Sequence, residues 1–372
     1  MRLELQILSA VAIDLVLGDP RWLPHPVRGI GRLALWLEGL SRSAVARVSR
    51  LSDSTQARCL RYGGLLTALA TYTVVGLATW GAIRLADAVR PWAADAVSIF
   101  VIYTTIAARD LARHSMAVFR SLVAGNLVEA RQRVGAIVGR DTQQLDEAGV
   151  VRAAVESVAE STVDGVTAPL FFAAIAGPVG AMVYRAVNTL DSMFGHQDDR
   201  YREFGWAAAR IDDLANYIPA RLTAPLICLA ALIFEVIQRA CRVGRVKRVP
   251  PGAACEDGGT RFTRPTLRAY IVPATRAVQI LARDGRKHAS PNSGLAEAAM
   301  AGALGVQLGG VNYYDGQPLE KPTIGDPLVP LSPRHIWSAN ALMFMTTGLF
   351  LAACLLLRAG TFHVWQAWRT AG

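Results

Sequence analysis

The stretch YGGLLTALATYTVVGLATWGAI, residues 62–83, contains no charged side chain over 22 positions. A helix of that length is long enough to cross a hydrocarbon core of about 30 Å. Two further apolar runs occupy residues 92–108, where Asp95 is the only charge, and 337–357, which has none. We therefore predict membrane-spanning helices at 62–83, 92–108 and 337–357, the first two joined by a loop of about eight residues.

The composition also favours a membrane protein. Of the 372 residues, 52% are hydrophobic and 18% are charged, whereas about 25% are charged in soluble domains. This balance argues against a disordered chain, a collagen-like fibre and an ordinary soluble enzyme. The five cysteines include no C-x-x-C pair, so neither a disulfide framework nor a zinc site is expected.

The formal net charge of +10 is concentrated in loops rich in arginine. In a membrane protein such loops lie on the cytoplasmic side, so a nucleic-acid partner is not inferred. The rule puts residues 19–61, 109–162 and 238–335 in the cytoplasm and residues 84–91 outside. The N-terminus, with Glu4 and Asp14, does not resemble a cleavable signal.

Three weaker apolar segments complete the set: residues 1–18, 163–183 and 219–237. Prolines and glycines interrupt the last two, as expected for broken helices that line a site inside the protein. If both cross the membrane, residues 184–218 lie outside; if neither crosses, these residues lie inside. The sequence leaves the two arrangements open.

No alternating series of strands is apparent, and most of the chain has a helical pattern. We predict an all-α, polytopic helical integral membrane protein with broken helices and large cytoplasmic helical loops. It forms a single domain over residues 1–372, with a variable Pro- and Gly-containing linker at 242–265.

Three carboxylates, Glu156, Glu160 and Asp164, recur every four residues. On a helix they fall within about 80° of one face. Like charges at this spacing destabilise a helix unless a cation meets them, and Mg²⁺ prefers such oxygen ligands. The alternative is a solvated acidic face beside a membrane helix, and the spacing alone does not separate the two.

Two further acidic groups follow, at 185–191 (RAVNTLD) and 210–216 (RIDDLAN). Each sets an amide and a carboxylate three residues apart, close to an arginine. Taken singly, helix caps and interface ion pairs explain them. Three acidic groups within about 60 residues of an acid-poor chain instead favour a functional site.

Three other segments carry polar side chains. Residues 283–292 (RDGRKHASPN) have the cations and the turn residues of an anion site, although a patch facing anionic lipid is the alternative. Residues 302–316 are glycine-rich, which is a weak nucleotide motif that close helix packing explains equally well. Residues 18–28 (GDPRWLPHPVR) hold charged side chains between prolines, and composition does not separate a structural from a catalytic role.

Five segments resemble, in order along the chain, blocks of the CobD/CbiB family of cobalamin-biosynthesis membrane proteins: 18–28, 156–165 with Pro169, 184–193, 204–219 and 282–315. The departures are Ser161, Val163, Ala289 and a variable loop at 249–260, and none affects a charged residue discussed here.

The resemblance implies adenosylcobinamide-phosphate synthase activity, an acid–amine ligase. Such an enzyme joins the ring-D propionate (position f) of adenosylcobyric acid, a corrinoid substrate, to (R)-1-aminopropan-2-ol or its O-phosphate. The reaction is written with ATP, which implies Mg²⁺. The family is multi-pass in the bacterial inner (cytoplasmic) membrane, where other late cobalamin-pathway membrane enzymes are possible partners.

Residue roles follow as hypotheses from the matching blocks. Glu156, Glu160 and Asp164 would hold the metal. Asp191, Asp212 and Asp213 would orient the amine or take its proton, so that all six carboxylates count as catalytic. The phosphate-binding residues would be Arg283, Arg286, Lys287, His288 and Asn292. The substrate-binding residues would be Asp19, Arg21, His25, Arg28, Arg185, Asn188, Arg210, Asn216, Asn312, Tyr313, Tyr314 and Asp315. Because the substrates are cytoplasmic, we predict that 163–183 and 219–237 dip into the membrane and place these groups in a cytoplasm-facing cavity.

Two other classes of protein are alternatives to this prediction. A Mg²⁺-dependent membrane phospho- or prenyltransferase also uses Asp-rich helices; here Asp164 to Ala168 begin the D-G-x-x-A-R motif, but Pro169 replaces its arginine. A non-catalytic membrane scaffold or regulator would give the carboxylates no reason to face the basic turn at 283–292.

Overall fold

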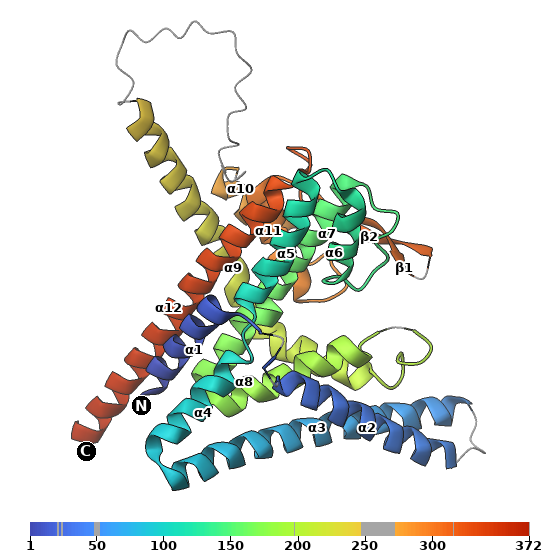
Figure 1. Ribbon diagram of the computed structural model, residues 1–372, viewed down its shortest axis with the longest axis vertical. Helices are drawn as coiled ribbons and strands as arrows, with labels where there is room; N and C mark the ends of the chain where they lie inside the picture. Colours follow the sequence, from blue (N-terminus) through green and yellow to red (C-terminus); the bar gives the residue numbers. More distant parts are fainter. Residues whose placement is uncertain are drawn as a thin grey trace, which may run out of the picture.

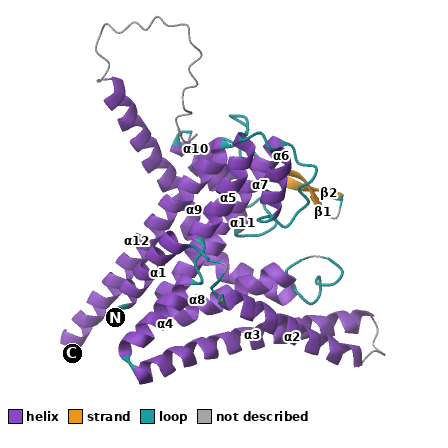
Figure 2. Ribbon diagram, viewed as in Figure 1, coloured by secondary structure: helices purple, strands orange, loops and turns teal. Residues whose placement is uncertain are grey.

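The structure is a computed structural model that describes residues 1–20, 22–23, 25–47, 53–196, 198–246, 272–314 and 316–371. The described chain is almost entirely helical (Figure 2). Its elements are α1 (Leu3–Leu17), α2 (Pro26–Arg47), α3 (Asp53–Val89), α4 (Pro91–Tyr103), α5 (Ala108–Val123), α6 (Leu127–Gly135), α7 (Glu147–Thr162), the π-helical turn η1 (Val163–Thr167), α8 (Ala168–Phe194), α9 (Trp206–Val246), α10 (Ala274–Asp284), α11 (Ser293–Leu304), β1 (Leu308–Tyr314), β2 (Gln317–Ile324) and α12 (Arg334–Ala371).

Five helical segments are long and apolar enough to cross a membrane: Ser54–Val89, Pro91–Val123, Glu147–Phe194, Trp206–Ala240 and Arg334–Arg358. Together they include all three clear predicted spans and both interrupted ones. The prediction of a polytopic helical membrane protein is therefore confirmed. The N-terminal segment predicted at 1–18 is the 15-residue helix α1, which is not among the five.

The predicted loop at 84–91 is wrong, because only Arg90 separates α3 from α4. Arg84 and Asp87, three residues apart on the helix, form an ion pair at 4.0 Å. Pro91 then starts α4, where a missing backbone N–H costs nothing. Charged residues here continue the helix and do not end it.

The predicted span at 92–108 contains a break. Helix α4 ends at Tyr103, and the Thr104 and Thr105 hydroxyls donate back to the carbonyls of the last turn. The Ala107 N–H then donates to the carbonyl oxygen of Gly165 in η1 at 2.9 Å. The break therefore attaches the α4–α5 junction to the π-helical turn.

Helix α8 is bent back on itself at Gly177, whose φ of 66° and ψ of −160° are not helical. The next residue, Pro178, has no N–H to donate to the carbonyl of Ala174, and Arg358 of α12 donates to that oxygen at 2.6 Å. Behind the bend, the ring of Tyr184 stacks on Phe172 with centroids 4.9 Å apart. This observation confirms that 163–183 is broken.

The prediction of a broken helix at 219–237 is wrong, because these residues belong to the continuous helix α9. It runs without interruption from Trp206 to Val246, although it contains Pro219 and Pro225. The Thr223 hydroxyl donates to the carbonyl of Pro219 at 2.7 Å and lies 2.6 Å from the Thr167 hydroxyl of η1. These hydroxyl contacts attach α9 to η1, and the two prolines leave the helix continuous.

The two strands form an antiparallel hairpin in which Tyr314 pairs with Gln317. The all-α prediction missed this hairpin, and neither interpretation of the glycine-rich residues 302–316, a weak nucleotide motif or close helix packing, included a strand. Gly309 and Gly310 lie in β1 with φ near +80°, a conformation that favours glycine. The missed signal is the Asp-Gly dipeptide at 315–316, which is typical of tight hairpin turns.

Helices α5, α6, α7, α10 and α11 gather with the hairpin at one end of the molecule, while α2 and α3 lie together at the other (Figure 1). Helices α9 and α12 pack against each other, and α9 also contacts α8, α10 and α11. The turn η1 contacts α7, α8 and α9. Polar residues on η1, α7, α8 and α9 can therefore lie close to one another. The predicted linker at 242–265 lies, beyond Val246, outside the described residues.

Candidate functional site

Acidic side chains from separate elements converge beside η1. Asp164 in the turn interacts electrostatically with Asp212 of α9, with Asp191 of α8 and with Glu160 of α7. We call Asp164, Asp191 and Asp212 the carboxylate cluster. One Asp212 oxygen accepts a hydrogen bond from Asn216 at 2.9 Å, while the other has no partner in the described part of the chain. Crowded carboxylates are costly unless a cation meets them.

The bend in α8 explains how this cluster forms. It returns Tyr184 to η1, where the hydroxyl lies 3.3 Å from the Asp164 carbonyl and donates to the Asn216 side-chain oxygen at 2.8 Å. The next residue, Arg185, is the cation that interacts with Asp164, and one of its nitrogens lies 3.5 Å from Asn188. The bent helix therefore brings the predicted 185–191 group against the predicted 156–164 group.

The proline-rich segment at 18–28 also lies near Arg185, the cation beside the carboxylate cluster. Its Asp19 carboxylate interacts with Arg185 and lies 3.8 Å from the His25 ring. Burial lowers the pKa of His25, and the positive charges of Arg185 and Arg28 lower it further. Arg21, predicted with this group, lies outside the described residues.

Next to the carboxylate cluster is a polar cavity of about 170 Å³ between α7, α11 and the hairpin. Three acids and three potential cations line it: Arg140, Glu156, Glu160, His288, Glu297 and Lys321. Glu160 faces this cavity, accepts a hydrogen bond from the Ser293 hydroxyl at 3.2 Å, and interacts with Asp164 and Asp191. It therefore connects the polar cavity to the carboxylate cluster.

Burial shifts the protonation of two groups in this cavity. It raises the pKa of Glu297 well above its ordinary value, and the neighbouring charges of Glu156 and Glu160 add to the effect. It lowers the pKa of His288, as does the nearby ammonium group of Lys321. A neutral imidazole can accept a proton, and a protonated carboxyl group can donate one.

The predicted metal ligands do not form a ready-made site. Glu156 is engaged by the guanidinium of Arg140 and accepts from the Gly309 N–H at 2.8 Å. Asp164 lies in the π-helical turn, which shifts the helical phase, and it interacts with Asp212 and Asp191 as well as with Glu160. Within the described ranges, no group of three His, Cys, Asp or Glu side chains is suited to hold a metal ion. The residues present therefore do not fit a resident Mg²⁺ bound by this triad.

The basic segment at 283–292 is divided among three places. Arg283 and Lys287 both pair with the buried Asp284 at 2.7 Å, and the hydrogen bond from Arg283 holds the Asp284 pKa well below its usual range. Arg286 lines a different cavity from Glu160. Of the four cations, His288 is the one that lines the polar cavity. An internal acid thus engages two members of the predicted phosphate-binding group, whose role stays a prediction.

A hydrogen bond between Asn292 and Asp213 joins the segment before α11 to helix α9. The Asn292 amide donates to the Asp213 carbonyl at 2.7 Å, while Arg210 interacts with the Asp213 carboxylate. Residues 184–218 therefore lie beside the segment that precedes α11. That both face one cytoplasm-facing cavity stays a prediction.

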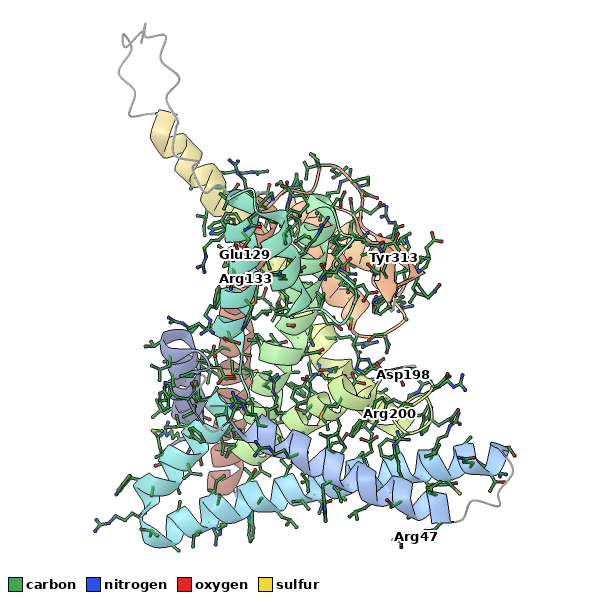
Figure 3. The ribbon with its side chains drawn as sticks, turned by 45° about the vertical axis from the view of Figure 1, so that its right-hand side comes forward. Arg47, Glu129, Arg133, Asp198, Arg200 and Tyr313 are labelled. Carbon is green, nitrogen blue, oxygen red and sulfur yellow. The ribbon has the colours of Figure 1, made fainter. Side chains whose placement is uncertain are left out.

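The residues at 312–315 have mostly structural partners. The buried Asn312 accepts from Arg140 at 2.5 Å and from Arg152 at 3.2 Å. Tyr313 lies on the hairpin (Figure 3) and its carbonyl accepts from the Asp141 N–H. Tyr314 lines the polar cavity, whereas Asp315 lies outside the described residues.

Sequence reasoning missed Arg140, Tyr184, Glu297 and Lys321. Glu297 had a usable signal, since it is the one charge in the run SGLAEAAMAGAL of α11. A lone carboxylate on an apolar helix has to find a polar cavity. Arg140 and Lys321 lie in loop and hairpin segments, where no periodicity identifies the direction of a side chain.

Comparison with known proteins now decides the family. The family model described as CobD/Cbib protein matches residues 7–343. The chain belongs to this family. The protein is 45% identical to the cobalamin biosynthesis protein CobD of Geobacter metallireducens over 94% of this chain and 93% of the relative. It is 39% identical to CobD of Leptospira interrogans over 95% and 97%, and 39% identical to CbiB of Salmonella typhi over 94% and 96%. No solved structure matches.

Membership of the CobD/CbiB family supports a role in cobalamin biosynthesis. The five candidate spans support a membrane location. Both statements agree with the resemblance noted in the sequence.

Proposed function

We propose that this protein forms an amide bond between the ring-D propionate of adenosylcobyric acid and (R)-1-aminopropan-2-ol or its O-phosphate. The observation that carries the proposal is the carboxylate cluster, which is next to the polar cavity and joined to it by Glu160. An amine substrate is an ammonium ion at neutral pH, and a group of carboxylates in a buried place attracts such a cation. The anionic side of the reaction would lie in the polar cavity, where Lys321 and His288 are located.

In this proposal the carboxylate cluster and the polar cavity have separate roles. Asp191 and Asp212 would accept hydrogen bonds from the ammonium and orient its nitrogen. Asp191 or Asp212 would first take one proton from the ammonium, so that the neutral amine can attack. Glu160 or the neutral His288 would take the second proton as the C–N bond forms and the activated acyl C–O bond breaks. Lys321, which forms no ion pair in the described residues, would stabilise negative charge on the acyl oxygen.

ATP and Mg²⁺ belong to the proposal through the family resemblance. ATP would activate the acyl group, and Mg²⁺ would enter with the nucleotide, since the residues that the structure describes form no closed metal site of their own. We also propose that the protein works in the bacterial inner membrane, where other late enzymes of the pathway could receive its product.

The test uses purified protein in detergent with adenosylcobyric acid and each form of the amine, with and without ATP. Amide product is measured by mass spectrometry and released phosphate by a colorimetric assay. We expect product only with ATP, loss of product with a chelator, and recovery when Mg²⁺ is added. Absence of product under every condition, from protein that is monodisperse, would overturn the proposal.

A matched pair of variants compares the loss of a carboxylate in the proposed site with the loss of one on the surface. Glu160→Gln keeps the size of the side chain, removes its charge and should lower the rate by about 10²-fold or more. The control is Glu129→Gln on α6 (Figure 3), an exposed acid paired with Arg133 at 2.9 Å. Equal rates for the two variants would exclude Glu160 from the reaction.

A further inference from the structure

Two cavities outside the polar site meet at Arg221 of α9. The first is an apolar groove of about 570 Å³ between α8, α9 and α12. Its walls include Phe171, Leu222, Leu226, Phe350, Ala353 and Leu357. The second is a cavity of about 410 Å³ that α9 shares with α10 and α11, lined by Arg221, Arg283 and Arg286. Arg221 and Pro225 line both, so the basic cavity and the groove adjoin at these two residues.

The charges in the basic cavity are unequal. Arg283 is engaged by Asp284 and Asp326, at 2.7 and 2.8 Å. Neither Arg221 nor Arg286 forms an ion pair with an acid in the described part of the chain. The cavity therefore presents two guanidinium groups whose charge no acid of the described chain balances.

Arg221 is held in place by neutral groups. Its guanidinium carbon lies 3.4 Å from the centroid of the Tyr217 ring, and one nitrogen donates to the Tyr217 carbonyl at 2.9 Å. The same nitrogen lies 3.3 Å from the Asn292 side-chain oxygen. These contacts orient the side chain and leave its charge available at the junction of the two cavities.

We propose that Arg221 and Arg286 bind the phosphate of an anionic phospholipid whose acyl chain occupies the groove. Three candidate membrane-spanning segments form the groove, so an alkyl chain fits its chemistry. Guanidinium groups bind phosphate through paired hydrogen bonds. A zwitterionic phospholipid would bring its own ammonium toward two guanidiniums, which disfavours it. A ligand with both an anionic head and a chain is required to fill both cavities.

The experiment is native mass spectrometry of the full-length protein in mild detergent with added phosphatidylglycerol or phosphatidylcholine. The wild type is expected to retain phosphatidylglycerol in preference to phosphatidylcholine. Arg286→Gln and Arg221→Gln should each weaken retention of phosphatidylglycerol about tenfold. Ala353→Trp fills the groove and should lower retention of both lipids. Arg286 is exposed, so its variant carries the test if Arg221→Gln fails to fold.

Two control variants match these changes. Arg276→Gln removes an exposed cation of α10 that lies 3.6 Å from Asp326 and lines neither cavity. Leu232→Trp adds the same bulk at an exposed position of α9 outside the groove. The proposal is overturned if the two lipids are retained equally, or if Arg276→Gln weakens retention as much as Arg286→Gln. Displacement of the lipid by inorganic phosphate, with no effect of Ala353→Trp, would also overturn it in favour of a free-anion site.

Discussion

Asp284 at the end of α10 is fully buried, whereas the carboxylate cluster beside η1 combines the buried Asp212 with the half-buried Asp164 and Asp191, and the partners of these two acidic features differ. Asp284 receives hydrogen bonds or ion pairs from Arg283, Lys287 and the Gly325 N–H, all at 2.7 to 2.9 Å. The cluster has three carboxylates, and Arg185 is the cation that interacts with Asp164. The comparison indicates two roles. An acid whose charge is balanced by neighbouring cations stabilises the fold, whereas a group of acids with fewer cations than carboxylates is suited to bind a cationic substrate.

The largest expected effect is that of Asp212→Asn. This variant keeps the shape of the side chain but removes a charge from the cluster, so amide formation should fall by about 10²–10⁴-fold. The melting temperature should stay constant or rise, because repulsion within the cluster decreases. Product formation and thermal unfolding are measured on the same sample, with exposed Asp87→Asn as the control. A large fall in melting temperature would make the cluster structural and remove the contrast with Asp284.

The second effect is on stability. Asp284→Asn leaves Arg283 and Lys287 without their shared acid and should lower the free energy of unfolding by about 2–4 kcal/mol. The lowered pKa of Asp284 means that its contribution is complete above the unfolded pKa near 4 and is lost as the pH falls through the folded pKa. Chemical denaturation at pH 7 and at pH 3 measures both. An unchanged unfolding midpoint at pH 7 would show that Asp284 is not a structural acid.

The third effect is on the pH dependence of the reaction. Burial lowers the pKa of His288, so its neutral form persists below pH 6.5 in the folded protein. If His288 takes the proton, the rate should be constant above that range and fall about tenfold per unit below the folded pKa. His288→Gln should lower the plateau and abolish this acid limb. An acid limb that survives in the variant assigns the proton to a carboxylate such as Glu160.

The smallest effect tests how the bend in α8 holds the cluster together. Tyr184→Phe removes the hydroxyl that donates to Asn216 and should cost about 1 kcal/mol of unfolding free energy. Because Asn216 in turn donates to Asp212, the KM for the amine should rise more than kcat falls. Steady-state kinetics with varied amine provide the measurement. A change in kcat alone would argue that Tyr184 contacts the reacting atoms directly.

The sequence located most of the membrane segments and much of the site, but it failed at specific positions. Uncharged length was sufficient to predict spans at 62–83 and 337–357, because the hydrocarbon thickness sets that requirement. Prolines gave an ambiguous signal: Gly177 with Pro178 bends α8, while Pro219 and Pro225 leave α9 continuous. At the bend in α8, a distant element satisfies the freed carbonyl, because Arg358 donates to the oxygen of Ala174.

The sequence by itself determined which residues are chemically able to act and which stretches have to be buried in lipid or protein, since both follow from side-chain type and periodicity. The tertiary structure decided which charges meet. Glu156 and Glu160 lie one helical turn apart and have the same chemistry, yet Arg140 from a loop engages the first. The second faces His288 and the carboxylate cluster. Ion pairing depends on the approach of distant segments, which local spacing does not encode.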